Sequence, residues 1–351
     1  MDILMKINMK VLSIAIMVAS VGMTASAQTS GSTAQPQQGS SSPAAPAAPL
    51  QLNSIGPPQK LQFPPADPKN FTAQSPTTQG VNAFLKQLWG YDPNRVWEVV
   101  GIQSTDAPNV SRVSILVGEQ GVSRTPATTV FFVTPDGQHA IAGSSVITFG
   151  AHPFASVQEK LVQQATGPYR GSSSKKLMLV EFADLQCPHC KEAAPTVDHL
   201  VKDFPNARVV FQNFPLTNVH PAAEKAAEYG VCIARQKGNA AFFQYIQAVY
   251  DTQADLMTNA DQTLKAAATK AGADAAEVST CAASPSAKAA VDASVKLGQE
   301  IGVDQTPLLF VNGRPVPVAG VPYATLKQII SYEASESGAT AEAATAGTGT
   351  K

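Results

Sequence analysis

The chain has 351 residues, enough for two domains, and 44% of them are hydrophobic, which is sufficient for a substantial core. Its 26 prolines and 24 glycines indicate that a sizeable part lies outside regular secondary structure. The formal net charge of -1 gives no reason to expect a nucleic-acid partner or an anionic membrane surface through bulk electrostatics.

The first segment, residues 1–27, has the features of a secretory signal peptide. Lys6 and Lys10 precede an apolar run over residues 11–21, and small residues lead to a cleavage site after Ala27. A membrane anchor is the less favoured alternative, because the apolar run is shorter than the roughly 20 residues that a spanning helix needs. We therefore expect an exported, periplasmic protein, in a compartment where disulfides form and persist.

Two segments have compositions that predict disorder. Residues 28–76 are rich in Gln, Ser, Pro and Ala, and residues 334–351 are rich in Ala, Thr, Gly and Ser. Such segments cannot bury enough apolar surface to offset the entropy of the chain.

Residues 77–167 are predicted to form a small α+β domain. Apolar residues at helical spacing predict a first helix over residues 81–88, and residues 156–166 are predicted to form a closing helix. Between them the pattern predicts five strands, over residues 96–102, 110–117, 128–134, 139–142 and 146–149. A short hinge containing Gly and Ser is expected over residues 167–174.

Residues 168–333 are predicted to form the second domain, in the order β-α-β, helical insertion, β-β-α. The insertion covers about residues 217–301, is rich in Ala and carries four helical segments (222–237, 240–250, 261–271 and 287–301). The elements around it are predicted as a strand (177–182), a helix (191–202), a strand (208–214), two strands joined by a turn at Asn312-Gly313 (308–311 and 316–318), and a helix (323–332).

The junction between the first strand and helix of this domain carries Cys187 and Cys190. Two cysteines separated by two residues at such a junction predict a redox-active dithiol. Cys187 opens the helix, where unpaired backbone N–H groups and the helix dipole favour the thiolate, so we expect it to be the attacking thiol. Cys190 lies one turn further and is expected to be the buried resolving thiol.

The two intervening residues are predicted to tune this dithiol. Pro188 fixes the backbone at the start of the helix. His189 can donate to the Cys187 sulfur or carry positive charge near it, which would stabilise the reduced thiolate and make the disulfide a stronger oxidant.

Other chemistries for the cysteines are less favoured. A zinc site would need more ligands, and the sequence has no second Cys-x-x-Cys and no His-x-x-x-His. An inert structural disulfide between Cys187 and Cys190 would gain little, because the loop it closes is so short. The chain has four cysteines, so pairing of these two leaves Cys232 to pair with Cys281. We expect no metal and no other cofactor.

Several motifs resemble the DsbA-type thiol-disulfide oxidoreductases of the thioredoxin superfamily, over roughly residues 170–333. The motifs are Glu181-Phe182-x-Asp184-x-x-Cys187-Pro188-His189-Cys190, Phe214-Pro215-Leu216 with His220-Pro221, and Gly302-Val303-x-x-Thr306-Pro307-x-x-Phe310-Val311-Asn312-Gly313. The resemblance implies an α/β protein with a thioredoxin fold and an inserted helical subdomain, preceded by the small α+β domain.

The resemblance also implies roles for individual residues. Pro307 would be a cis-proline that lies with Thr306 against the dithiol, where backbone groups are offered to a bound peptide. Glu181 would be a buried acid that relays a proton to or from Cys190; an exposed carboxylate at a strand end is the less favoured alternative. His220 is expected to be structural, and the second cysteine pair, Cys232 and Cys281, to be a structural disulfide of the insertion.

Residues 129–143 in the first domain resemble the N-terminal dimerisation domain of DsbC/DsbG-type isomerases, which implies a homodimer through residues 77–167. The favoured prediction is an oxidase that introduces disulfides into reduced or misfolded exported proteins and is reoxidised by a membrane-bound partner. A dimeric isomerase or reductase, with a reducing partner, is the first alternative. A non-catalytic chaperone module that binds peptides is the second.

Overall fold

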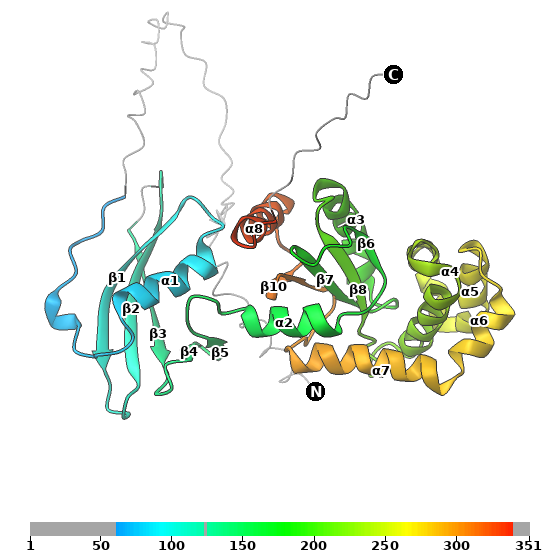
Figure 1. Ribbon diagram of the computed structural model, residues 1–351, viewed down its shortest axis with the longest axis horizontal. Coiled ribbons are helices and arrows are strands. Elements are labelled where there is room, and N and C mark those ends of the chain that lie inside the picture. The colour runs from blue at the N-terminus through cyan, green and yellow to red at the C-terminus, as the bar shows by residue number, and fades with distance from the viewer. Residues whose placement is uncertain (1–60, 123–124, 340–351) are drawn as a thin grey trace, which may run out of the picture. The chain divides into compact units, whose positions relative to one another are not determined.

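The computed structural model describes residues 61–122 and 125–339 (Figure 1). The predicted signal peptide, residues 28–60 of the predicted linker and residues 340–351 of the predicted tail lie outside the described residues. The described chain divides into two compact units. One contains the residues up to Thr78 together with Asn94–Ile147, and the other contains Gln79–Pro93 together with the residues from Thr148 onwards.

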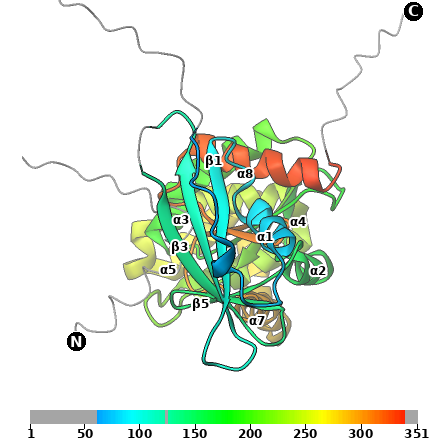
Figure 2. The same ribbon diagram turned by 90° about the vertical axis from the view of Figure 1, so that its left-hand side faces the viewer.

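The first unit is built on an antiparallel sheet whose strands follow one another in chain order (Figure 2). Side chains alternate between its faces, as the pleat requires: Val113 and Ile115 are buried, whereas Arg112 is exposed. The strands are β1 (Arg95–Ser104), β2 (Ser111–Glu119), β3 (Ala127–Val133), β4 (His139–Ala142) and β5 (Ser145–Thr148).

Part of the predicted disordered linker lies against this sheet. A short 3-10 helix, η2 (Pro68–Asn70), precedes Phe71, which forms a bridge with Ile102 of β1. The backbone N–H groups of Thr72 and Ala73 both donate to the carbonyl of Ile102. The composition predicted disorder here, but backbone hydrogen bonds to the edge strand β1 fix the position of residues 71–73.

The helices at both ends of the first sheet belong to the second unit, although the sequence grouped them with the sheet. Helix α1 (Thr78–Trp89) buries Phe84 and Leu85, and the Tyr332 hydroxyl donates to the Lys86 carbonyl near its end. Helix α2 (Ala155–Gln164) contributes Leu161 to the core of the second sheet. An apolar helical face shows that a helix is covered, but it does not show by which element.

The second unit contains a mixed sheet in the order β10-β9-β7-β8-β6. Strand β7 (Met178–Ala183) is at its centre, is buried along its whole length and runs parallel to β8 (Arg208–Asn213). Strands β9 (Leu308–Val311) and β6 (Tyr169–Gly171) run antiparallel to their neighbours, and β10 (Arg314–Pro317) forms a hairpin with β9. Strand β6 falls within the predicted hinge.

Helices cover both faces of this sheet (Figure 1). Helices α3 (Pro188–Asp203) and α8 (Tyr323–Glu336) pack on the face formed by Leu179, Val209 and Leu309. Helices α2 and α7 pack on the opposite face, against Phe182 and Phe310. The order of strands and helices confirms the α/β architecture that the sequence predicted.

The helical insertion consists of α4 (Ala223–Asp251), η3 (Gln253–Asp255), α5 (Leu256–Lys270), α6 (Ala275–Ala282) and α7 (Pro285–Glu300). Helix α4 combines two predicted helices, which meet at Gly238, where φ is 81°. Helix α6 was not predicted, and it begins at Asp274, whose side chain accepts from the N–H groups of Ala276 and Glu277. Cys281 therefore lies in α6, between the helical segments predicted over residues 261–271 and 287–301.

Candidate active site

Cys187 and Cys190 lie where β7 gives way to α3, beside the helical insertion. Cys187 is the residue immediately before α3, and Pro188 is the first residue of the helix. Cys187 is 4% exposed and Cys190 is fully buried, and both are free thiols. Both belong to the core cluster that also includes α4, α5 and α6. The insertion therefore forms one wall of the site.

The surroundings of Cys187 favour its thiolate. A hydrogen bond from the Cys190 thiol lowers the pKa of Cys187 to about 5, and Thr306 and the backbone N–H groups of Cys190 and His189 act in the same direction. Burial opposes this shift but does not cancel it. At neutral pH Cys187 is thus an ionised thiol at the start of a helix, the state in which sulfur is nucleophilic.

Cys190 has the opposite tendency. Burial is the largest cause that raises its pKa, and the neighbouring Cys187 raises it further. Two groups favour charge on this sulfur: the backbone N–H of Asp184, which donates to Cys190 Sγ at 3.4 Å, and the side chain of Thr306. The two thiols therefore differ in the way expected for an attacking and a resolving cysteine.

Thr306 and Pro307 face the dithiol from the loop before β9. The peptide bond between them is cis. The thiol of Cys187 donates to the Thr306 carbonyl at an Sγ to O distance of 3.6 Å. The Thr306 hydroxyl is buried and has no hydrogen-bond partner among the described residues. A thiolate cannot donate to a carbonyl, so the Thr306 hydroxyl is the group of this residue that can donate to the ionised Cys187, in addition to the Cys190 thiol and the backbone N–H groups.

Replacing Thr306 by valine is expected to raise the pKa of Cys187 by about one unit, because the variant keeps the shape of the side chain and removes a donor to a charged group. The pH dependence of iodoacetamide alkylation of the reduced protein measures this pKa. Thr306→Ser is the matched control, since it keeps the hydroxyl and should keep the midpoint. Equal midpoints for the valine variant and the wild type would contradict the assignment.

Glu181 lies on β7 and is buried. Burial raises the pKa of its carboxyl to about 7, although the charge of Arg170 lowers it and that of Asp198 raises it further. The register places Arg170, Leu179 and Glu181 on the same face of the sheet, beneath α3, and Arg170 is in contact with Asp198 of α3 at 2.5 Å. A buried acid that titrates near neutral pH can both give and take a proton.

Replacing Glu181 by glutamine is expected to change how stability depends on pH. The folded carboxyl retains its proton up to about pH 7, whereas the carboxyl in the unfolded chain loses its proton near pH 4.3. The wild type therefore loses stability as the pH rises from about 4.3 to about 7, and a further rise causes no further loss from this group. Glu181→Gln should lack this loss, so its stability relative to the wild type should increase by about 4 kcal/mol between pH 4 and pH 8. Urea unfolding at pH 4, 6 and 8 tests this. A difference between the two proteins that does not change with pH would contradict it.

Pro188 and His189 occupy the first turn of α3. The His189 ring is exposed, and its Nδ1 lies 3.1 Å from Glu192 Oε2. The backbone N–H of His189, by contrast, contributes to the lowered pKa of Cys187. In this structure the contact of His189 with Cys187 is thus made by the backbone, while the side chain pairs with Glu192.

Several buried polar side chains around the dithiol were not assigned a role from the sequence. Asp184 and Gln186 flank the loop before Cys187, and Ala222 N–H donates to the Gln186 side chain at 2.8 Å. Gln253 from the insertion donates to the carbonyls of Leu185 and Cys187, both at 3.0 Å. These contacts satisfy the polar groups of the loop that carries Cys187.

Two further side chains at this site, from the β8–α4 connection and from the insertion, are His220 and Tyr250. His220, expected to be structural, lies 2.7 Å from the Asp184 carboxylate through its Nδ1. Burial, and then the charge of Cys190, raises the pKa of Tyr250 well above 10, and Glu181 and Asp184 add to this effect. For Asp184 and His220, the sequence offered one indication of a role at the site, namely that each lies in the connection that follows a predicted strand.

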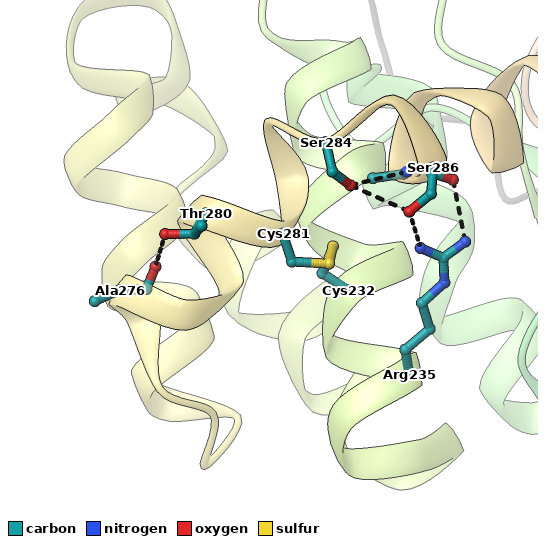
Figure 3. Close-up of a disulfide and its surroundings, with 8 residues drawn as sticks. Cys232, Arg235, Ala276, Thr280, Cys281, Ser284 and Ser286 are labelled. Atoms are coloured by element: carbon teal, nitrogen blue, oxygen red, sulfur yellow. Dashed lines mark hydrogen bonds between the residues drawn. A yellow bond between two sulfur atoms is a disulfide. The ribbon is translucent and has the colours of Figure 1, made fainter.

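Cys232 of α4 and Cys281 of α6 form a disulfide (Figure 3). Cys232 is fully buried and Cys281 partly buried. Close by, the guanidinium of Arg235 donates to the side chain and the carbonyl of Ser286, both at 3.1 Å, and so joins α4 to α7. The disulfide thus links α4 to α6 within the insertion and does not join the insertion to the sheet.

The described residues contain no group of three or more His, Cys, Asp or Glu side chains placed to hold a metal ion. Within the same part of the chain, no helix has the length and apolar character needed to cross a membrane.

A family model described as thioredoxin matches residues 163–331. Among curated proteins, a stretch of 67 residues is 42% identical to the Na(+)/H(+) antiporter NhaA 3 of Salinispora tropica and covers 19% of this chain and 10% of that protein. A stretch of 147 residues is 29% identical to the Na(+)/H(+) antiporter NhaA 1 of Mycolicibacterium vanbaalenii and covers 41% of this chain and 23% of that protein. The chain thus spans less than a quarter of the length of these relatives.

Two solved structures illustrate the structural comparison. A thioredoxin-like oxidoreductase from Silicibacter pomeroyi is 24% identical, covers 50% of this chain and 95% of its own, and has a TM-score of 0.41. BdbD from Bacillus subtilis, in its oxidised form, is 18% identical, covers 48% of this chain and 92% of its own, and has a TM-score of 0.43.

Proposed function

Residues 163–331 form a thioredoxin-like domain, and we propose that it makes the protein an exported, periplasmic thiol-disulfide oxidoreductase that introduces disulfides into exported proteins. The observation that carries the proposal is the contrast between the two thiols. The pKa of Cys187 is lowered to about 5, whereas burial raises that of Cys190. A low pKa at Cys187, the attacking thiol of the pair, stabilises the reduced form and makes the disulfide more oxidising.

The exchange takes place in two steps. A substrate thiolate attacks Cys187 Sγ of the oxidised protein, the bond to Cys190 breaks, and the electron pair passes to Cys190 Sγ, where a proton from the Glu181 carboxyl neutralises it. A second substrate thiolate then attacks the substrate sulfur of the mixed disulfide and releases Cys187 as a thiolate. The substrate has gained a disulfide, and the protein dithiol has gained two electrons.

Two partners complete the cycle. The substrates are reduced or misfolded exported proteins, whose backbone would meet the Thr306–Pro307 segment beside Cys187. A membrane-bound oxidoreductase carrying a disulfide accepts the two electrons by a further exchange and returns the pair to its oxidised form.

The reduction potential of the Cys187–Cys190 pair, measured by equilibration with glutathione, tests the oxidase proposal. We expect a value nearer to the roughly -120 mV of strong oxidants than to the roughly -270 mV of thioredoxin. A value at the thioredoxin end would reject it. Cys187→Ser should abolish oxidation of a reduced substrate protein, and a variant that still prevented aggregation as well as the wild type would point to a chaperone instead.

A dimeric isomerase or reductase is the second candidate, and the first sheet offers one observation in its favour. Phe132 of β3 and Ile141 of β4 are paired in register and both are exposed, so they form an apolar pair on one face. We propose a homodimer through this unit. Sedimentation should then show a dimer that Phe132→Lys combined with Ile141→Lys converts to a monomer. A wild type that sediments as a monomer at every concentration rejects both the dimer and the isomerase alternative.

A further inference from the structure

We propose that Asp184 and His220 are positioning residues for Cys190: together they hold the backbone N–H of Asp184 on the Cys190 sulfur, where it stabilises the negative charge that this sulfur receives during exchange. The proposal rests on the thiol-disulfide exchange proposed above. Neither side chain hydrogen-bonds to the sulfur of Cys187 or Cys190, so both act through the Asp184 amide.

The Asp184 side chain has no exposed surface, and its two oxygens are fully engaged. Oδ1 accepts from the N–H of Gln186 at 2.7 Å. Oδ2 accepts from the N–H of Leu216 at 2.8 Å and lies 2.7 Å from Nδ1 of His220. The carboxylate therefore ties the loop before Cys187 to the connection between β8 and α4.

The topology explains why these groups meet. Strands β7 and β8 are parallel, so their carboxyl ends lie at the same edge of the sheet. Asp184 is the first residue after β7, and Leu216 and His220 follow β8. A contact between residues 36 positions apart in the chain thus arises from the way the two strands pair.

Burial makes this arrangement rigid. A buried carboxylate that loses a donor is left with unsatisfied charge in a medium of low dielectric constant, which is costly. Asp184 cannot turn or shift without such a loss, and its backbone is fixed along with its side chain. The Asp184 N–H is consequently held at 3.4 Å from Cys190 Sγ, instead of reorienting when charge appears there.

A fixed donor of this kind is useful in the first exchange step. When a substrate thiolate attacks Cys187, Cys190 is the leaving group, and its sulfur takes up the electron pair of the broken disulfide. A donor already aimed at the place where charge develops stabilises the transition state without reorganisation. Cys190 is otherwise poorly suited to carry charge, because burial raises its pKa.

The test is the rate at which dithiothreitol reduces the oxidised full-length protein, followed by acid quenching and mass spectrometry of the alkylated thiols. His220→Leu removes the donor to Asp184 and should slow the reaction about tenfold. His220→Asn places an amide N–H where Nδ1 lies and should restore most of the rate. His139→Leu is the matched control, since His139 pairs with Asp136 at 2.8 Å in the other compact unit, and it should react like the wild type.

A second measurement separates positioning from general loosening of the loop. The pKa of Cys187, read from the pH profile of alkylation, should be the same in His220→Leu as in the wild type, because the groups that lower it do not include Asp184 or His220. If His220→Leu does not fold, the isosteric variant Asp184→Asn replaces it, and its reduction by dithiothreitol should be slowed by the same factor.

Three results would overturn the proposal: an unchanged rate in His220→Leu and Asp184→Asn, a His220→Asn variant as slow as His220→Leu, or a shift in the pKa of Cys187 that parallels the loss of rate. Failure of the proposed function has a different signature. In that case the reduction potential of the wild-type pair would lie at the thioredoxin end, or the oxidised wild type would not oxidise a reduced substrate protein, whereas the variants could still be compared in their reaction with dithiothreitol.

Discussion

Replacing Arg314 by methionine is expected to lower the free energy of unfolding by about 3–5 kcal/mol, because it leaves a buried carboxylate without its partner. Arg314 of β10 and Glu333 of α8 are 7% and 8% exposed in their side chains, and Nε lies 2.7 Å from Oε1. Urea unfolding followed by circular dichroism measures the loss.

The remaining guanidinium contacts explain why the effect should be large. Arg314 Nη1 donates to the carbonyl of Leu88 at 3.2 Å, and Nη2 donates to that of Gln87, so both cap the end of α1. Its guanidinium also lies 4.5 Å from the ring centre of Phe154. The substitution thus removes an ion pair and the attachment of a helix at the same time.

A double variant, Arg314→Met with Glu333→Leu, is the control. It removes the stranded carboxylate and should recover part of the lost stability. The loss in the single variant should also shrink on acidification, since burial raises the pKa of Glu333 and the protonated acid costs less to leave unpaired. A double variant no more stable than the single one would show that the α1 contacts, rather than the ion pair, dominate.

Replacing both Cys232 and Cys281 by alanine is expected to cost about 4 kcal/mol of unfolding free energy. The disulfide joins residues 49 positions apart, and closing a loop of that length restricts the unfolded chain by about this amount in the chain-entropy model. The measurement compares urea unfolding of the wild type and of the double variant, each with and without dithiothreitol.

The reductant provides the internal control. It should destabilise the wild type to the level of the double variant treated in the same way, since any effect of reducing Cys187–Cys190 is common to both proteins. A loss below about 1 kcal/mol would mean that the unfolded insertion is already compact, so that the bond restricts it little.

The sequence could predict the dithiol because its signal is local. Cys187 and Cys190 are separated by two residues and follow an apolar run, and both the spacing and the strand-to-helix junction can be read within a dozen residues. Most strands and helices of the second unit were equally accessible, since hydrophobic periodicity reports each element separately, although β6 and α6 were missed.

The support of the site was less accessible, because it depends on contacts between distant residues. Gln253 reaches Leu185 and Cys187 from the insertion, and no pattern around a single glutamine reveals a partner more than 60 positions away. Asp184 and His220 were an intermediate case. Both follow strands that the sequence predicted, but pairing them required knowing that the two strands are adjacent and parallel.

The passage of the chain between its two compact units has a practical consequence. The chain crosses from the first unit to the second before Gln79, returns after Pro93, and crosses again after Ile147. Neither unit is therefore a continuous piece of sequence, and in the sequence α1 lies between the two segments that make up the other unit. A single proteolytic cut at any one of these crossings leaves a covalent connection or the α1–Arg314 contacts in place, so neither unit is released. A truncated protein that begins after Ile147 would lack α1, although α1 belongs to the second unit and contacts Arg314 there.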